Sequence, residues 1–135
     1  MNMINLEFDG YWLDRNKSGI PSKAGIYCVY TCLYNKSENT VSIRNLVYIG
    51  EATDVNNRIS NHEKLDRFLA QCSNDEVICY SFAPVLNQDR AKAEAALIYK
   101  HKPFLNDEYK YNYPFPSVRI SITGKTACLY SDFTI

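Results

Sequence analysis

The sequence lacks the long apolar segments of membrane and secreted proteins. No run of eighteen apolar residues occurs, and the stretch from Met1 to Glu7 has no apolar core of a signal peptide. Internal repeats, linkers and low-complexity stretches are also absent. We therefore expect one cytoplasmic domain over residues 1–135 with no membrane partner, large enough to bury about two thirds of its unfolded surface.

The cysteines provide neither a disulfide framework nor a zinc site. The chain has five, an odd number, at positions 28, 32, 72, 79 and 128. Such scattered cysteines are typical of reduced, mostly buried thiols. Cys28 and Cys32 fall on an apparent strand rather than in the tight turn of a zinc knuckle, and no second pair follows.

An excess of basic charge is absent as well. Fifteen basic residues balance fifteen acidic ones, and the pI is near 6.7. Proteins that bind nucleic acid without sequence preference gain affinity by neutralising phosphates, so composition by itself does not suggest a nuclease. Residues 90–110 hold five basic residues against three acidic ones. Any nucleic-acid surface is therefore expected to be a local patch that binds weakly on its own.

The residues that are present predict an α+β domain. Strands are expected over 4–8, 25–34, 41–49, 77–82, 118–122 and 126–130. Helices are expected over 54–62, 63–71 and 88–101. Thr53 or Asp54 can cap the first helix and Asn87 the last. A polar turn predicts an antiparallel hairpin of the second and third strands, and Gly124-Lys125 predicts a second hairpin near the C-terminus.

Two tyrosine motifs are the most informative part of the chain. They are Gly25-Ile26-Tyr27 and Tyr48-Ile49-Gly50, with their tyrosines 21 residues apart. Each motif is short enough to recur by chance. Their order and spacing, together with the polar residues downstream, make them informative.

Arg58 and His62 are four residues apart and would share one face of a helix. The planar guanidinium of arginine donates two hydrogen bonds to a phosphate and stays charged at any working pH. Without the tyrosine motifs upstream, a surface arginine beside a surface histidine would be the simpler interpretation.

Glu94 borders the buried stripe of its predicted helix, together with Leu97 and Ile98. A buried carboxylate requires a positive partner. Arg90, four residues earlier, is one candidate, although this order of charges is the less favourable one on a helix. A divalent metal is the other, since magnesium suits one carboxylate with water and phosphate oxygens. Both alternatives remain open from spacing alone.

Tyr27 and Asn106 also have ordinary structural explanations. Most of the 11 tyrosines must be packing or surface residues. Holding a phenolate with an ordinary pKa of about 10 at pH 7 costs roughly 4 kcal/mol, which a metal, Arg58 or a hydrogen bond to His62 can offset. Asn106 is either a loop cap or a fixed hydrogen-bonding arm near the carboxylate.

Taken together, these residues resemble the GIY-YIG nuclease domain. The resemblance covers residues 23–107, from the two tyrosine motifs through Arg58, His62 and Glu94 to the segment Pro103-Phe104-Leu105-Asn106. It implies a central three-stranded antiparallel sheet flanked by helices. Residues 108–135 match nothing in that core and would add the C-terminal β-hairpin.

The resemblance also implies an endonuclease that hydrolyses DNA, most simply double-stranded DNA, with one Mg²⁺ or Mn²⁺ ion. Glu94 would ligate the metal. Tyr27 would orient or deprotonate the attacking water, and His62 would relay or anchor that proton. The products would carry a 5′-phosphate and a 3′-hydroxyl.

The remaining implied roles concern the phosphate. Arg58 would clamp the scissile phosphate and stabilise the charge that develops on it. Tyr48 would line the site, and Asn106 would brace it. The lysine that several relatives carry near the helix arginine or the first tyrosine is missing from that place, where Asn56 and Asn57 precede Arg58.

Two other functions remain open. One is a non-catalytic nucleic-acid-binding or protein-interaction module that retains the fold, which the zero net charge favours. The other is an assembly domain that uses Tyr109, Tyr111 and Tyr113 as contacts. A nuclease of this size also often depends on a partner protein or an oligomer for specificity.

Overall fold

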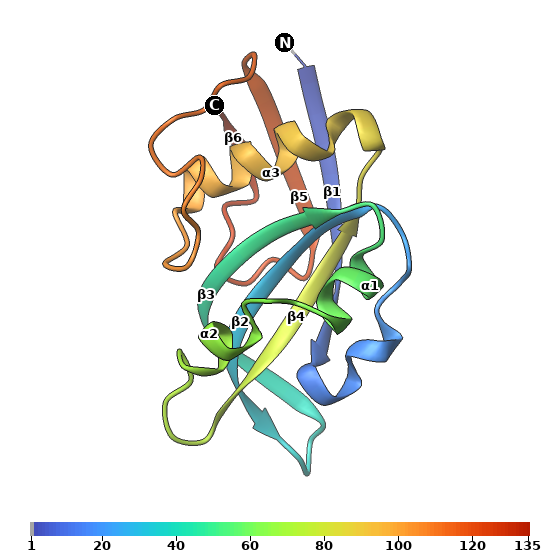
Figure 1. Ribbon diagram of the computed structural model, residues 1–135, viewed down its shortest axis with the longest axis vertical. Helices are drawn as coiled ribbons and strands as arrows, with labels where there is room; N and C mark the ends of the chain where they lie inside the picture. The colour runs from blue at the N-terminus through green and yellow to red at the C-terminus, as the bar shows by residue number, and fades with distance from the viewer. Residues whose placement is uncertain (1) are drawn as a thin grey trace.

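The computed structural model describes residues 2–135 and is built on a strongly curved sheet that forms half of a barrel (Figure 1). The strands are β1 Asn2–Leu13, β2 Gly25–Asn35, β3 Thr40–Ala52, β4 Glu76–Pro84, β5 Val118–Gly124 and β6 Asp132–Thr134. The helices are the 3-10 helix η1 Asp14–Gly19 and the α-helices α1 Val55–Ser60, α2 Leu65–Leu69 and α3 Asn87–His101. Within the described residues, no helix has the length and apolar composition needed to cross a membrane.

The expected fold class is wrong in its central feature. The strands form one six-stranded mixed sheet in the order β3-β2-β4-β1-β5-β6, with 41% of residues in strands and 24% in helices. β1 pairs antiparallel with β4 and parallel with β5, so it joins the expected three strands to the C-terminal ones. The sheet is thus not three strands flanked by helices.

The C-terminal strands β5 and β6 do pair antiparallel, but the expected two-residue turn at Gly124-Lys125 and the strand over 126–130 are wrong. β5 runs on through Gly124, and β6 begins only at Asp132. Gly124 lies opposite Phe8 in the parallel pair of β1 and β5, with φ of +85°. A Cβ atom there would lie 2.1 Å from the Phe8 carbonyl oxygen. Gly124 is therefore required for the close approach of β1 and β5, and it does not form the predicted turn.

The sheet buries both of its faces. Along β2, Cys28, Tyr30 and Cys32 belong to the hydrophobic cluster that includes α3, because alternate strand residues point to opposite faces. Tyr27 and Val29 belong to a second cluster with residues of α1 and α2. This explains why the burial of β2 is continuous rather than alternating.

The predicted capping residue is correct for α1 and wrong for α3. The Asp54 side chain accepts a hydrogen bond of 3.0 Å from the Asn57 amide, which confirms Asp54 as the cap of α1. Asn87 is instead the first residue of α3, and Leu86 occupies the cap position with no side-chain hydrogen bond.

Candidate active site

Pairing of β2 with β3 brings the two tyrosine motifs together. Tyr27 lies directly opposite Gly50 in the antiparallel register, and Tyr48 lies opposite Val29. Residues 48 and 50 point to the same face, so the Tyr27 and Tyr48 rings are diagonal neighbours with centroids 6.2 Å apart. The expected hairpin is thus confirmed, and its register explains the order of the motifs.

Each motif glycine makes room for another group. A Cβ atom on Gly50 would lie 2.3 Å from the phenolic oxygen of Tyr27, so only glycine lets that ring cross β3. A Cβ atom on Gly25 would lie 2.2 Å from the Ala83 carbonyl oxygen in the neighbouring strand. The glycines are therefore required by steric contact.

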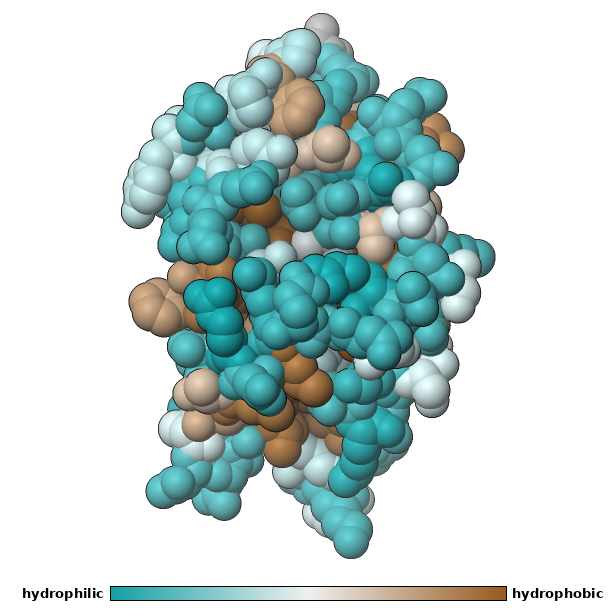
Figure 2. Space-filling view, viewed as in Figure 1, coloured by the Kyte–Doolittle hydropathy of each residue, from teal (hydrophilic) through white to brown (hydrophobic). Residues whose placement is uncertain are grey.

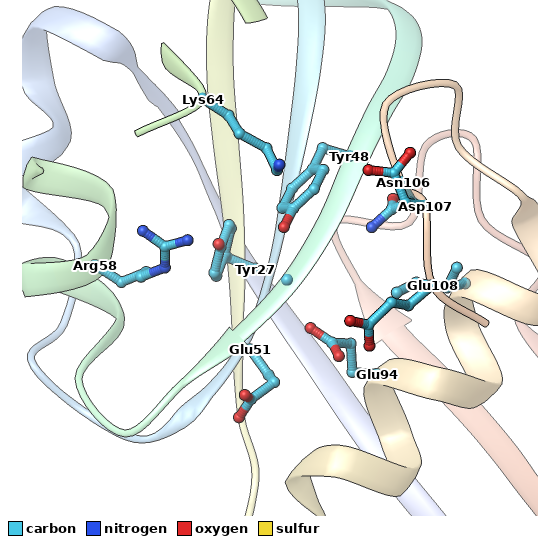
Figure 3. A pocket seen from close by; sticks show the side chains of 11 residues that line it. Tyr27, Tyr48, Glu51, Arg58, Lys64, Glu94, Asn106, Asp107 and Glu108 are labelled. Carbon is cyan, nitrogen blue, oxygen red and sulfur yellow. The ribbon is translucent and has the colours of Figure 1, made fainter. Parts of the chain in front are cut away.

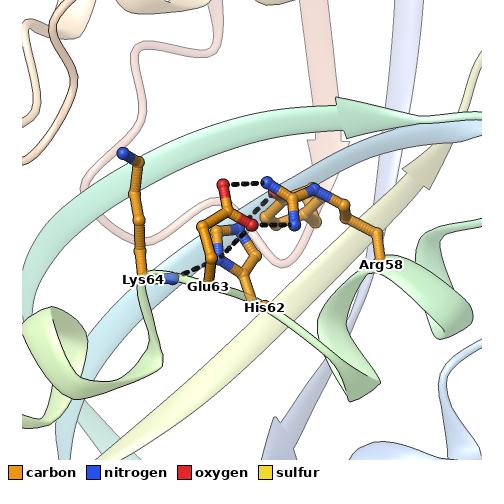
Figure 4. A network of polar contacts seen from close by, with 5 residues as sticks. Arg58, His62, Glu63 and Lys64 are labelled. Carbon is orange, nitrogen blue, oxygen red and sulfur yellow. Dashed lines mark hydrogen bonds and ion pairs between the residues drawn. The ribbon is translucent and has the colours of Figure 1, made fainter.

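The buried His62 ring is bonded to Tyr27, but it does not lie on the helix that carries Arg58. α1 ends at Ser60, so the expected side-by-side placement of Arg58 and His62 on one helix face is wrong. His62 Nε2 lies 2.7 Å from the Tyr27 hydroxyl oxygen. His62 Nδ1 lies 3.1 Å from the backbone nitrogen of Lys64 (Figure 4).

These two contacts fix which ring nitrogen of His62 has the proton. A backbone N–H can only donate, so Nδ1 accepts from Lys64, and the neutral ring is protonated on Nε2. His62 consequently donates to the Tyr27 oxygen and leaves the phenolic proton of Tyr27 for another partner. Burial, followed by the charge of Arg58, lowers the pKa of His62 to about 4, so the ring is neutral at pH 7.

Arg58 is held by a carboxylate that the sequence did not single out. Its Nη1 and Nη2 atoms donate to the two carboxylate oxygens of Glu63 at 2.5 and 2.8 Å (Figure 4). The pair lowers the pKa of Glu63 to about 2, although the Glu63 side chain is 63% exposed. Arginine has five N–H donors, so three remain for a phosphate. Because the Glu63 side chain is exposed to solvent, it can also move away from Arg58 and free the two donors that it occupies.

Glu94 extends from α3 toward the same region and has no cationic side chain as a partner among residues 2–135. Arg90, the candidate from helix spacing, instead pairs with Glu51, which follows the second tyrosine motif. Burial, and then the charges of Glu51 and Glu108, raise the pKa of Glu94 to about 7. A cation beside Glu94 would relieve this concentration of negative charge.

Asn106 acts on the backbone of the second motif. Its side-chain oxygen accepts from the Ile49 amide at 3.0 Å, and its side-chain nitrogen donates to the Ile49 carbonyl at 2.9 Å. The Leu105 amide donates to the Val47 carbonyl at 3.0 Å. β3 is an edge strand, so Leu105 and Asn106 pair with backbone groups that no strand covers.

The candidate residues surround one cleft of about 310 Å³ (Figure 3). Tyr27, Tyr48, Arg58, Glu94 and Asn106 all line it, and His62 lies behind Tyr27. The sequence analysis missed further lining residues, namely Glu51, Lys64, Asp107 and Glu108. Lys64, Asp107 and Glu108 lie within two residues of a predicted site residue, and Glu51 directly follows the second tyrosine motif, so proximity in sequence was the available signal.

Opposite charges lie on opposite sides of the two tyrosine rings. Arg58 and Lys64 are on one side, and Glu94 and Glu108 are on the other (Figure 3). Lys64 thus brings an ammonium group to the cleft although no lysine directly precedes Arg58. A phosphodiester between the two sides would meet cations directly and would need a metal to meet the carboxylates.

The donor set fits a weakly held divalent ion rather than a preformed cage. Residues 2–135 contain no group of three or more His, Cys, Asp or Glu side chains arranged to hold a metal. Magnesium, however, is typically bound through one or two carboxylates, with waters and substrate phosphate oxygens completing the octahedron. Glu94, which faces the cleft without a cationic partner, satisfies that requirement.

The electrostatics limit what Tyr27 can do alone. Burial raises the pKa of Tyr27 well above its ordinary value, and the adjacent Tyr48 raises it further. Tyr27 is therefore a neutral phenol at pH 7, and a positive charge in the cleft is required before it can act as a base.

Comparisons with protein-family models, with curated proteins and with solved structures find no match for this chain.

Proposed function

We propose that the protein is a metal-dependent endonuclease that hydrolyses DNA phosphodiester bonds, as the resemblance to the GIY-YIG nuclease domain implies. The observation that supports this most strongly is the common cleft. Side chains far apart in the sequence, from Tyr27 to Glu108, line it together, with the cations Arg58 and Lys64 on one side and the carboxylates Glu94 and Glu108 on the other.

In this mechanism a water molecule attacks phosphorus from the side of Tyr27. The phenolic oxygen orients that water while His62 Nε2–H donates to the same oxygen and stabilises negative charge on it. His62 thus anchors Tyr27 rather than removing its proton. The new bond joins the water oxygen to phosphorus, and a proton of that water passes to the solvent. The bond between phosphorus and the 3′ oxygen breaks, and that oxygen takes up a proton from the solvent.

The cations act on the phosphate. Arg58 offers the N–H donors that Glu63 does not use, and Lys64 adds a second positive charge, so negative charge that develops on the phosphoryl oxygens meets fixed partners. Mg²⁺ or Mn²⁺ held by Glu94 would polarise a phosphoryl oxygen and stabilise the leaving oxygen. Asn106 keeps the Tyr48-Ile49-Gly50 backbone in place beneath the substrate.

Cleavage of plasmid and branched DNA in the presence of Mg²⁺ or Mn²⁺ tests the proposal. We expect the wild type to nick the DNA and Glu94→Gln to lose this activity in both metals. Glu38→Gln, at the exposed turn between β2 and β3, is the matched control and should behave as the wild type. Equal and undetectable cleavage by the wild type and Glu94→Gln across metals would refute hydrolysis.

A non-catalytic nucleic-acid-binding or protein-interaction module is the second candidate. The observations that favour it are the zero net charge and the engagement of Arg58 by Glu63. Such a module would bind DNA without any dependence on a divalent metal and would leave it intact. Binding titrations with and without Mg²⁺, on the same substrates, separate the two functions.

A further inference from the structure

The segment that follows α3 has two different sides. Asn106, Asp107 and Glu108 line the cleft, and Glu108 points toward Glu94 (Figure 3). Other side chains of this segment and of the end of α3 form a separate group, which we call the aromatic patch: Tyr99, Lys102, Phe104, Lys110 and Tyr111.

Large aromatic rings in the aromatic patch are open to solvent. Phe104 is 73% exposed and Tyr111 is 83% exposed, which is unusual for side chains of this size. Tyr109 and Tyr113, from the same tyrosine-rich stretch, instead pack against the hydrophobic core. The structure thus divides these tyrosines into packing residues and an exposed one.

Two lysines hold the aromatic patch in a defined shape. The Lys102 ammonium lies 4.2 Å from the Tyr99 ring centroid and 5.3 Å from that of Tyr111, and it donates to the Tyr99 carbonyl at 2.6 Å. Lys110 Nζ donates to the Phe104 carbonyl at 3.5 Å. In the described part of the chain, neither ammonium forms an ion pair with a carboxylate.

We propose that the aromatic patch binds a single-stranded segment of nucleic acid that leaves the cleft. Exposed aromatic rings stack on unpaired bases, and unpaired lysine charges neutralise the phosphates between them. The same short segment lines the cleft and supports the patch, so a strand held at one passes to the other. This inference rests on the proposed function, because it takes the cleft as the place where the strand is cut.

The chemistry of the surface favours this occupant over a protein. Protein interfaces are enriched in aromatic residues but depleted in lysine. The face of the molecule in Figure 2 is mostly hydrophilic. In the aromatic patch, two lysines lie among the rings: the Lys102 ammonium lies 5.3 Å from the centroid of the Tyr111 ring, and Lys110 Nζ donates to the Phe104 carbonyl. Rings interleaved with cations complement bases interleaved with phosphates. The preferred substrate is therefore DNA with an unpaired segment beside the scissile bond, such as a flap or an overhang.

Fluorescence anisotropy with a labelled single-stranded oligonucleotide and a blunt duplex of the same sequence, at low salt and without divalent metal, tests the inference. Tyr111→Ala and Phe104→Ala should each raise the Kd for the single strand about fivefold or more, because stacking on one base is lost. The Kd for the duplex should change less than twofold. Tyr111→Phe should bind as the wild type, since it keeps the ring.

Leu86→Ala is the matched control, because Leu86 is 68% exposed and lies at the opposite end of α3. It should leave both Kd values unchanged. The inference is wrong if the wild type does not bind the single strand, if Tyr111→Ala and Phe104→Ala match the wild type, or if they weaken both substrates equally. It is also wrong if these substitutions change only self-association, since the patch would then contact a second copy.

The binding result is independent of catalysis. A wild type that binds single strands through the aromatic patch but never cuts DNA would refute the proposed function and leave the inference standing. A wild type that cuts DNA in a Glu94-dependent manner, with Tyr111→Ala binding and cutting as well as the wild type, would refute the inference alone.

Discussion

The pair of hydrogen bonds between Asn106 and Ile49 makes the second tyrosine motif depend on one amide side chain. Both backbone groups of Ile49 that face away from β2 use Asn106 as their partner. Ile49 is fully buried and Asn106 is 6% exposed. Replacing Asn106 with alanine therefore leaves a buried N–H and a buried C=O without partners.

The expected loss follows from the cost of unsatisfied buried groups. Each such group costs about 1–3 kcal/mol, so the two together would cost about 2–6 kcal/mol. The cleft is adjacent, and water that enters from it can satisfy part of this loss. We therefore expect Asn106→Ala to lower the free energy of unfolding by about 2–4 kcal/mol. Asn106→Asp should cost at least as much, because it places a carboxylate oxygen against the Ile49 carbonyl.

Urea denaturation monitored by circular dichroism measures this free energy. Asn112→Ala, in an exposed part of the same segment, is the control and should stay within about 0.5 kcal/mol of the wild type. Native-state hydrogen exchange adds a local measurement, since the Ile49 amide should lose protection in Asn106→Ala. A change below 0.5 kcal/mol in Asn106→Ala, with the Ile49 amide still protected, would refute the structural role.

Three further predictions follow from the site. Gly50→Ala should displace the Tyr27 ring, destabilise the protein by about 1–3 kcal/mol and abolish cleavage, which melting curves and DNA assays would detect. Glu63→Gln should release Arg58 and lower the Kd for DNA by up to about fivefold in anisotropy titrations at low salt, an effect that disappears at high salt. The folded pKa of His62 is lowered to about 4, so its neutral form adds stability above pH 6.5 that is lost as the pH falls toward 4. Denaturation should accordingly show the stability advantage of the wild type over His62→Gln shrinking by up to about 3 kcal/mol from pH 7 to pH 4, and a pH-independent difference would contradict this.

Local interactions were predictable from the sequence, and long-range pairing was not. The β2–β3 hairpin and α3 are specified by adjacent residues, such as the polar turn after β2. The parallel pairing of β1 with β5 joins residues more than 100 positions apart and leaves no local pattern. Gly124 shows the consequence, because its sequence context indicates a turn while its actual constraint is the Phe8 backbone.

In the candidate site, too, some residues could be predicted from the sequence and others could not. The motif tyrosines, Arg58 and Glu94 were identifiable because their chemistry and order are distinctive. The partners that set their properties were not, since Glu63 and Glu51 are ordinary surface residues until the fold places them. Arg58 and His62 do not share a helix face, because α1 ends at Ser60, and both instead lie beside Glu63.

The most direct test of the central claim is a comparison of the wild type, Glu94→Gln and Tyr27→Phe on one DNA substrate with increasing Mn²⁺. The account predicts metal-dependent cleavage by the wild type, none by Glu94→Gln, and strongly reduced cleavage by Tyr27→Phe despite a folded structure. Metal-dependent cleavage that all three proteins share, or DNA left intact by the wild type at every metal concentration, would contradict it.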